Sequence, residues 1–216
     1  GDGYVYVAEY NNHRIQKFDS DGVFVTKWGG FGTGNGQFHS PYDVAVDSSG
    51  DVYVADTDNY RIQKFDSDGV FVTKWGSNGS GNGPILAPSS VAVDSNSNVY
   101  VADHYRIQKF DSDGTFVTIW GSLGSANGQF QAPHGVAVDS SGNVYVADTY
   151  NYRIQKFGIA HQLHTDGYTY EYSDTHGHTD RDTNAYEHIH AYGHTDAHGH
   201  THAYNHTHIH SNTYAV

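Results

Sequence analysis

The sequence predicts an all-β protein built from repeated antiparallel units of four short strands. The string RIQKF occurs four times at spacings of 45 to 47 residues, beginning at Arg14, Arg61, Arg106 and Arg153. A tryptophan keeps the same step, at Trp28, Trp75 and Trp120. Each repeat holds four runs rich in Val, Ile, Tyr and Phe, separated by Gly, Asp and Ser, and no run has helical periodicity. Four strands in a repeat of this length are typical of a β-propeller blade.

The second repeat illustrates the expected order of elements. Its strands are VAVD at residues 44–47, VYVAD at 52–56, RIQKF at 61–65 and VFVTKWG at 70–76. Short Asp/Ser/Gly segments join them, and such segments favour tight turns for backbone reasons. A Gly-rich connection then leads to the next repeat. The Asp-x-Asp-Gly segments superficially resemble calcium loops, but they lack the distant Glu of an EF-hand, so we interpret them as hairpin turns.

The repeats do not fill whole blades at either end. Residues 1–29 supply the last three strands of a unit, complete units begin at Val44 and Val91, and the unit from Val136 stops after its third strand. We therefore expect an incomplete ring of about three and a half blades. If each open face exposes about 400 Å² of apolar surface, burying it is worth about 10 kcal/mol at about 25 cal/mol per Å². We therefore expect that the arc closes with a partner chain, two copies giving a ring of seven blades, or that the chain is a fragment. Assembly into rings or fibres through open blade edges is an alternative function.

These motifs carry a family resemblance. VAVDSSGNVYVAD at residues 136–148, the RIQKF strands and the later WG and GNGQF segments resemble NHL repeats, and Asn12, His13 and Arg14 stand where that family takes its name. The resemblance covers residues 1–157 and implies a β-propeller, commonly of six blades. The chain opens with Gly1 and not with Met, as expected of a processed or excised segment.

Composition excludes several classes of function. The formal net charge is −13, and the repeats hold seventeen acidic against ten basic side chains. A nucleic-acid surface needs a basic footprint, so we expect no nucleic-acid partner, although some NHL relatives bind RNA. No apolar run approaches the roughly 20 residues of a membrane span, so we expect no membrane partner. The absence of cysteine and the sequons at Asn78 and Asn205 favour an extracellular or cell-surface location.

We expect a protein that is not an enzyme. The NHL resemblance includes amidating lyases, which gather metal-binding His with catalytic Tyr and Arg at the propeller centre. The corresponding axial positions, just after the repeated proline, are Tyr42, Ser89 and His134, which supply one histidine and not a set. The trio Asp56, Asn59 and Arg61 before and within the RIQKF strand recurs as Asp148, Asn151 and Arg153 and, with Glu, as Glu9, Asn12 and Arg14. We therefore predict a structural ion pair there.

The predicted function is a non-catalytic interaction scaffold that binds protein, peptide or glycan partners through its loop faces. The candidate contact residues are Phe31, Tyr42, Tyr60, His134, Tyr150 and Tyr152.

Residues 158–216 form a predicted tail of different composition. They contain 13 of the 17 histidines and have too little Val, Ile, Leu and Phe for a core of their own. His-x-His pairs place imidazoles on one face of an extended strand, where they can converge on Zn, Ni or Cu. A solvated tail that binds metal only loosely is the alternative, and no cofactor is required. The candidate metal ligands are His176, His178, His188, His190, His198, His200, His202, His206, His208 and His210.

Overall fold

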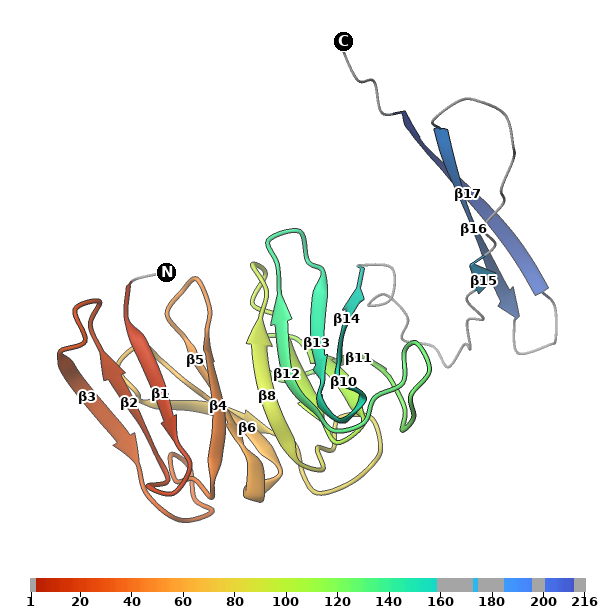
Figure 1. Cartoon of the computed structure of the whole chain (residues 1–216). Helices are drawn as coiled ribbons and strands as arrows, with labels where there is room; N and C mark the ends of the chain where they lie inside the picture. Colours follow the sequence, from red (N-terminus) through yellow and green to blue (C-terminus); the bar gives the residue numbers. More distant parts are fainter. Residues whose placement is uncertain (1–2, 159–172, 175–184, 196–200, 212–216) are drawn as a thin grey trace, which may run out of the picture. The chain divides into compact units, whose positions relative to one another are not determined.

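The computed structural model divides the chain into two compact units, Gly1–Thr165 and Asp166–Val216. It describes residues 3–158, 173–174, 185–195 and 201–211 (Figure 1). Beyond residue 158 it describes only the backbone of the strands. Within the described residues, no helix is long and apolar enough to cross a membrane.

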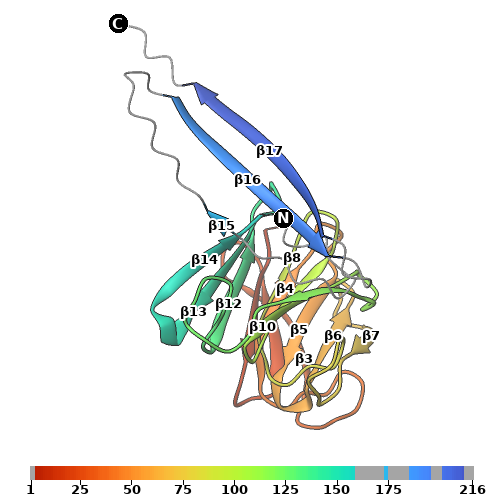
Figure 2. The ribbon, with the colours of Figure 1, turned by 90° about the vertical axis from the view of Figure 1, so that its right-hand side faces the viewer.

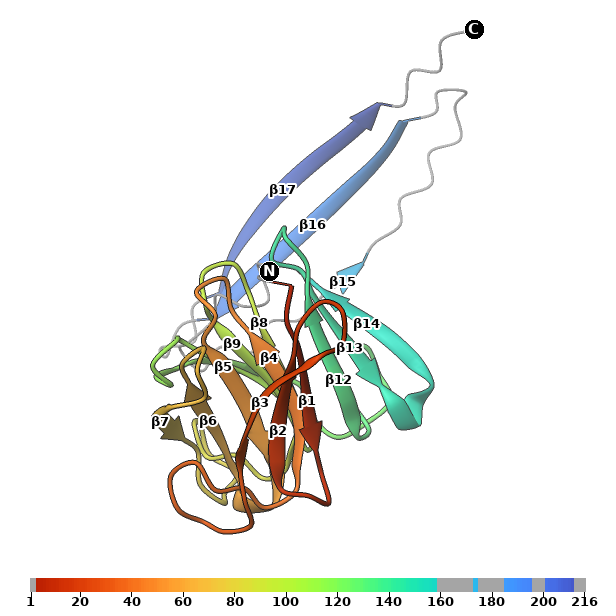
Figure 3. The ribbon, with the colours of Figure 1, turned by 90° about the vertical axis from the view of Figure 1, so that its left-hand side faces the viewer.

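The first unit contains four antiparallel sheets, here called blades 1 to 4 (Figures 1 and 3). Blade 1 comprises β1 (Val5–Glu9), β2 (Arg14–Phe18) and β3 (Phe24–Gly29). Blade 2 comprises β4 (Pro41–Val46), β5 (Val52–Asp56), β6 (Arg61–Phe65) and β7 (Phe71–Trp75). Blade 3 comprises β8 (Pro88–Val93), β9 (Val99–Asp103), β10 (Arg106–Phe110) and β11 (Phe116–Trp120). Blade 4 comprises β12 (Pro133–Val138), β13 (Val144–Asp148) and β14 (Arg153–Phe157). Short 3₁₀ turns, η1 (Thr57–Asn59) and η2 (Thr149–Asn151), follow β5 and β13. The predicted fold, an incomplete β-propeller with two whole and two partial blades, is confirmed.

The first strands of blades 2, 3 and 4 begin earlier than their alternating patterns predict. β4 starts at Pro41 and pairs it with Asp56, and the register then shifts before Asp43. The same shift occurs between Pro88 and Ser90 and between Pro133 and Gly135. A bulge leaves one residue without a ladder partner and re-aims its side chain. The bulged residue is the one directly after each proline.

The core lies between the blades. Each blade has a front face, directed toward the next blade in the chain order, and a back face, directed the opposite way; between consecutive blades the front face of one packs on the back face of the next. The front face of blade 1 contributes Ile15 and Trp28 to a cluster with Val52, Val54 and Phe65 from the back face of blade 2. Equivalent clusters form between blades 2 and 3 and between blades 3 and 4. Because the repeats are nearly identical in sequence, the same contact is made three times. The tryptophan ring of each blade lies against a phenylalanine ring of the following blade, with centroids 5.8 to 5.9 Å apart. The pairs are Trp28–Phe65, Trp75–Phe110 and Trp120–Phe157.

The Asp-x-Asp-Gly segments form the predicted hairpin turns. One carboxylate oxygen of Asp66 accepts hydrogen bonds from the N–H groups of Asp68 (3.0 Å) and Val70 (2.9 Å). Gly69 has a φ of +83°, which favours glycine. A Cβ atom there would lie 2.7 Å from the Trp28 ring of the preceding blade. This glycine is therefore required both by its own turn and by the contact between blades.

The second unit is a three-stranded antiparallel sheet in the order β15 (Ser173–Asp174), β16 (Ala185–Thr195) and β17 (Thr201–Ser211), seen in Figure 2. Its register pairs His188 with His208 and His190 with His206. Among the predicted metal ligands, six have a described strand position: His188, His190, His202, His206, His208 and His210. The remaining four lie outside the described residues: His176, His178, His198 and His200.

Candidate functional site

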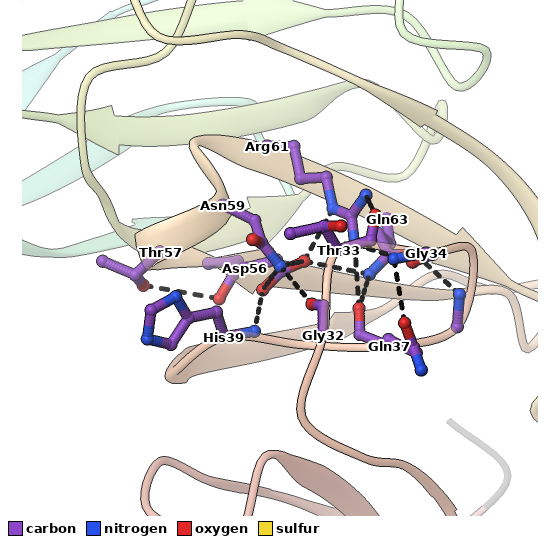
Figure 4. A network of polar contacts seen from close by, with 12 residues as sticks. Gly32, Thr33, Gly34, Gln37, His39, Asp56, Thr57, Asn59, Arg61 and Gln63 are labelled. Carbon is purple, nitrogen blue, oxygen red and sulfur yellow. Dashed lines mark hydrogen bonds and ion pairs between the residues drawn. The ribbon is translucent and has the colours of Figure 1, made fainter.

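A buried carboxylate, Asp56, Asp103 or Asp148, organises the loop end of blades 2 to 4, as Figure 4 shows for blade 2. Asp56 is fully buried at the end of β5. It accepts hydrogen bonds from Arg61 Nε (2.7 Å), Asn59 Nδ2 (2.9 Å) and Gln63 Nε2 (3.0 Å). The backbone N–H of His39 donates a further bond of 2.7 Å. All four donors offset the cost of placing a carboxylate where water does not reach it.

The other end of this network holds the Gly-rich connection between blades 1 and 2. The Arg61 guanidinium donates to the backbone oxygens of Thr33 (2.7 Å), Gly34 (2.9 Å) and Gln37 (2.8 Å). Gln63 Nε2 donates to the same Gln37 oxygen at 2.7 Å. The carbonyl groups of an irregular segment thus find partners in the blade that follows it.

The predicted ion pair is present in all four blades. Arg106 and Arg153 lie 2.9 and 2.8 Å from Asp103 and Asp148, although the blade 3 loop is two residues shorter. Burial alone would raise the pKa of Asp148. Hydrogen bonds from the Gln131 N–H, then from Asn151 and Arg153, outweigh burial and hold that pKa below its usual value.

Blade 1 has a variant of this network in which, among the described residues, no Gly-rich connection is bound by the arginine. Arg14 Nε donates to Glu9 at 3.0 Å, and Asn12 and Gln16 donate to the same carboxylate. The hydrogen bonds from Arg14 and Asn12 lower the pKa of Glu9. In the described part of the chain, the guanidinium of Arg14 donates to Glu9 and not to a backbone carbonyl.

A second feature is a row of four exposed aromatic rings, two of which lie at the bulges of first strands. β4, β8 and β12 lie side by side, and the bulge sets Tyr42, Ser89 and His134 at equivalent positions. The rings of Tyr42 and His134 have centroids 6.4 Å apart. Tyr10, between β1 and β2, lies 5.9 Å from Tyr42, and Tyr150 of η2 lies 6.2 Å from His134. These four residues, Tyr10, Tyr42, His134 and Tyr150, are called the aromatic row.

The structure therefore brings together three of the predicted contact residues, Tyr42, His134 and Tyr150. Ser89, the third axial position, lies between blades 2 and 4, and its hydroxyl donates to the Pro133 carbonyl at 2.6 Å.

The other predicted contact residues lie elsewhere. The Phe31 ring packs against the rings of His13 and His39, with a centroid distance of 5.0 Å in each case. Tyr60 and Tyr152 cap η1 and η2 in the left-handed conformation, with φ of 56° and 54°, and Tyr152 is 94% exposed. No ring contact with the aromatic row is present for these three residues within the described part of the chain. Sequence reasoning missed Tyr10 as a member of the row. The signal that could have found it is departure from the repeat, since blades 2 and 4 have threonine at this position.

In the part of the chain whose side chains are described, no group of three His, Asp or Glu residues is placed to hold a metal ion. The candidate site of the first unit is therefore the aromatic row, a surface of exposed rings and hydroxyl groups. Such side chains offer large apolar faces with polar tips, which suits recognition of a peptide or sugar surface.

The sheets, their face-to-face order and the repeated carboxylate–Arg pair define the first unit as part of a β-propeller. Residues 38–65, in blade 2, and residues 130–157, in blade 4, match the NHL repeat family.

Solved structures agree at the level of the fold. Virginiamycin B lyase from Staphylococcus aureus is 14% identical, with a TM-score of 0.53 over 94% of this chain and 67% of that protein. A streptogramin B lyase is 16% identical, with a TM-score of 0.53 over 94% of this chain and 65% of that one. A functionally unknown protein from Desulfotomaculum acetoxidans is 16% identical, with a TM-score of 0.53 over 74% of this chain and 52% of that protein. The chain thus spans about half to two thirds of the length of these proteins. No curated protein is significantly similar in sequence.

Proposed function

We propose that the first unit is a non-catalytic interaction scaffold whose aromatic row binds a peptide or a glycan. One observation carries this proposal: exposed rings from blades 1, 2 and 4 form a continuous series, with centroid separations of 5.9 to 6.4 Å. Rigid amphipathic rings contribute a large contact area at a small cost in conformational entropy. A peptide or oligosaccharide laid along the row would contact several rings at once.

The polar groups of the repeats favour a scaffold over an enzyme. Asp56, Asp103 and Asp148 are buried, and each is paired with the arginine of its own blade. A catalytic site would require one blade whose residues at this position differ from those of the others. Two of the structural neighbours are lyases by name. Their sequence identity to this chain is only 14 to 16%, so the similarity extends to the fold and not to the activity. The net charge of −13 favours peptide or glycan partners over nucleic acid.

The test uses the full chain against a displayed random-peptide library and a glycan array. Ligands selected by the wild type are then measured with the double variant Tyr42→Ala/Tyr150→Ala. We expect at least a tenfold loss of affinity, because two rings of the row are removed. Tyr152→Ala is the control, since this tyrosine is 94% exposed and makes no described ring contact with the row. Equal affinity of the double variant and the control would refute the proposal.

Divalent-metal binding by the second unit is a second candidate function, and the strand register favours it. Directly paired residues of antiparallel strands share a face, as do residues two apart along one strand. The pairs His188–His208 and His190–His206 therefore occupy four adjacent positions on one face of β16 and β17. Neutral imidazoles are good ligands for Zn, Ni and Cu.

Calorimetric titration of the full chain with ZnCl₂ tests this candidate. Replacing His188, His190, His206 and His208 with Asn should weaken zinc binding at least tenfold, and His104→Asn in the first unit should leave it unchanged. If the fourfold variant binds zinc as the wild type does, the histidines do not act through this register.

A further inference from the structure

The two outer faces of the first unit repeat the surfaces that pack inside it. The back face of blade 1 presents Val5, Val7, Phe18 and Phe24, which correspond to Val52, Val54, Phe65 and Phe71 of blade 2. The front face of blade 4 presents Tyr145, Ala147 and Ile154, which correspond to Tyr53, Ala55 and Ile62. Each outer face is thus one half of an interface that already occurs three times.

Exposure distinguishes the outer copies from the inner ones. Val5 is 51% exposed, whereas its counterparts Val52 and Val99 are fully buried. Ile154 is 65% exposed, whereas Ile62 and Ile107 are fully buried. Apolar strand residues that are buried at all three contacts between blades are therefore open to solvent on both outer faces.

Polar contacts between blades follow the same repeat. Lys17 Nζ donates to the Ser67 carbonyl of the next blade at 3.0 Å, and Lys64 Nζ donates to the Ser112 carbonyl at 3.3 Å. Lys156 is the corresponding exposed lysine of blade 4.

The matching turn of blade 1 is also uncovered. A Cβ atom added at its glycine, Gly22, would meet no neighbouring atom within 4 Å, although the equivalent Gly69 and Gly114 lie against a tryptophan ring. The back face of blade 1 thus has an open site where a preceding blade would pack.

We propose that the front face of blade 4 packs on the back face of blade 1 of a second copy of this chain. In this contact Ile154 lies against the partner's Val5 and the partner's Phe18, and Lys156 donates to the partner's Ser20 carbonyl. The two faces differ, so the interface is heterologous. Such interfaces give a closed ring only if the rotation that relates one chain to the next returns to the first chain. Because each chain occupies four blade positions and not three and a half, two copies form a closed ring of eight blades and not seven. Eight lies within the usual range for propellers, about four to eight.

The described part of blade 4 has no counterpart of Trp28, so this interface buries less than the internal ones. We therefore expect reversible association that depends on concentration and saturates at two chains.

The test is sedimentation velocity of the full chain from about 1 to 200 µM. The wild type should shift from 23.8 kDa towards twice that mass. Val5→Asp alters only the back face and Ile154→Asp only the front face, and each variant alone should remain monomeric. Val72→Asp is the matched control, because this valine is also 51% exposed but lies on β7 of an internal blade. It should associate like the wild type.

Mixing the two variants distinguishes a heterologous contact from any other. The Val5→Asp chain keeps an intact front face and the Ile154→Asp chain keeps an intact back face, so an equimolar mixture should recover a 1:1 pair. A wild type that stays monomeric at 200 µM, or a mixture that does not pair, would overturn the proposal. Masses that rise beyond two chains would support the contact and overturn ring closure. Circular dichroism checks that each variant is folded, and Lys156→Glu provides a second, milder change in the front face.

Discussion

The rings of Tyr42 and His134 lie 6.4 Å apart although the two residues belong to blades 2 and 4. Blade 3 lies between these blades along the chain, but its residue at the equivalent position is Ser89, a small side chain bound to the Pro133 carbonyl. The short side chain leaves room for the larger rings to approach each other. Departure from the repeat at this position thus creates the candidate binding surface.

Replacing Tyr42 with Ser, the residue that blade 3 has at this position, should separate binding from folding. Tyr42 is 50% exposed, so we expect little change in the free energy of unfolding. Affinity for a selected peptide or glycan should fall about tenfold, because the ring that joins Tyr10 to His134 is lost. Tyr42→Phe should keep most of the affinity. Binding that survives Tyr42→Ser would place the ligand elsewhere.

Asp56→Ala should destabilise the first unit strongly. Arg61, which is nearly buried, would lose its charged partner at 2.7 Å. Removing one partner of a buried ion pair costs about 3–5 kcal/mol in the free energy of unfolding. Urea unfolding followed by tryptophan fluorescence measures this loss. Asp58→Ala is the control, because Asp58 is solvent-accessible and its pair with His39 is long, at 3.7 Å. Similar losses for both variants would show that burial of the pair is not the cause.

Stability should fall in acid through Asp148. Hydrogen bonding lowers the pKa of this carboxyl in the folded state, so its contribution is complete above the ordinary pKa of the unfolded chain. The contribution is lost as the pH falls below about 4 and through the lower folded pKa. Asp148→Asn should therefore show a shallower decrease in unfolding free energy below about pH 4 than the wild type. Parallel pH profiles would contradict this assignment.

Gly69→Ala and Gly22→Ala should measure the contact between blades. Both glycines have positive φ, +83° and +78°, so alanine strains both turns to a similar extent. Only at Gly69 would the added methyl group also meet the Trp28 ring, at 2.7 Å. We expect Gly69→Ala to destabilise the unit by about 1–3 kcal/mol more than Gly22→Ala, as overpacking does. Thermal unfolding of the two variants compares them directly, and equal midpoints would argue against a tight contact at Trp28.

Much of the first unit was predictable because its information is local. Alternating apolar residues and Asp-x-Asp-Gly turns specify strands and hairpins within each blade. The spacing of Asp56 and Arg61 across a short loop likewise predicted their ion pair, and an equivalent pair is present in each of the other three blades. Nearly identical repeats must pair in nearly identical ways, so one blade predicts the next.

The amino-acid sequence by itself thus determined the strands, the turns, the repeat and the carboxylate–Arg pairs. Only the tertiary structure decided which residues from different blades meet. The bulge after Pro41 departs from simple alternation, and the proximity of Tyr10 to Tyr42 depends on how one blade is placed against the next. The burial of Ile62 and the exposure of Ile154, in the same RIQKF string, depend only on whether another blade covers them. Local patterns specify a blade, but the contacts of a blade depend on its neighbours.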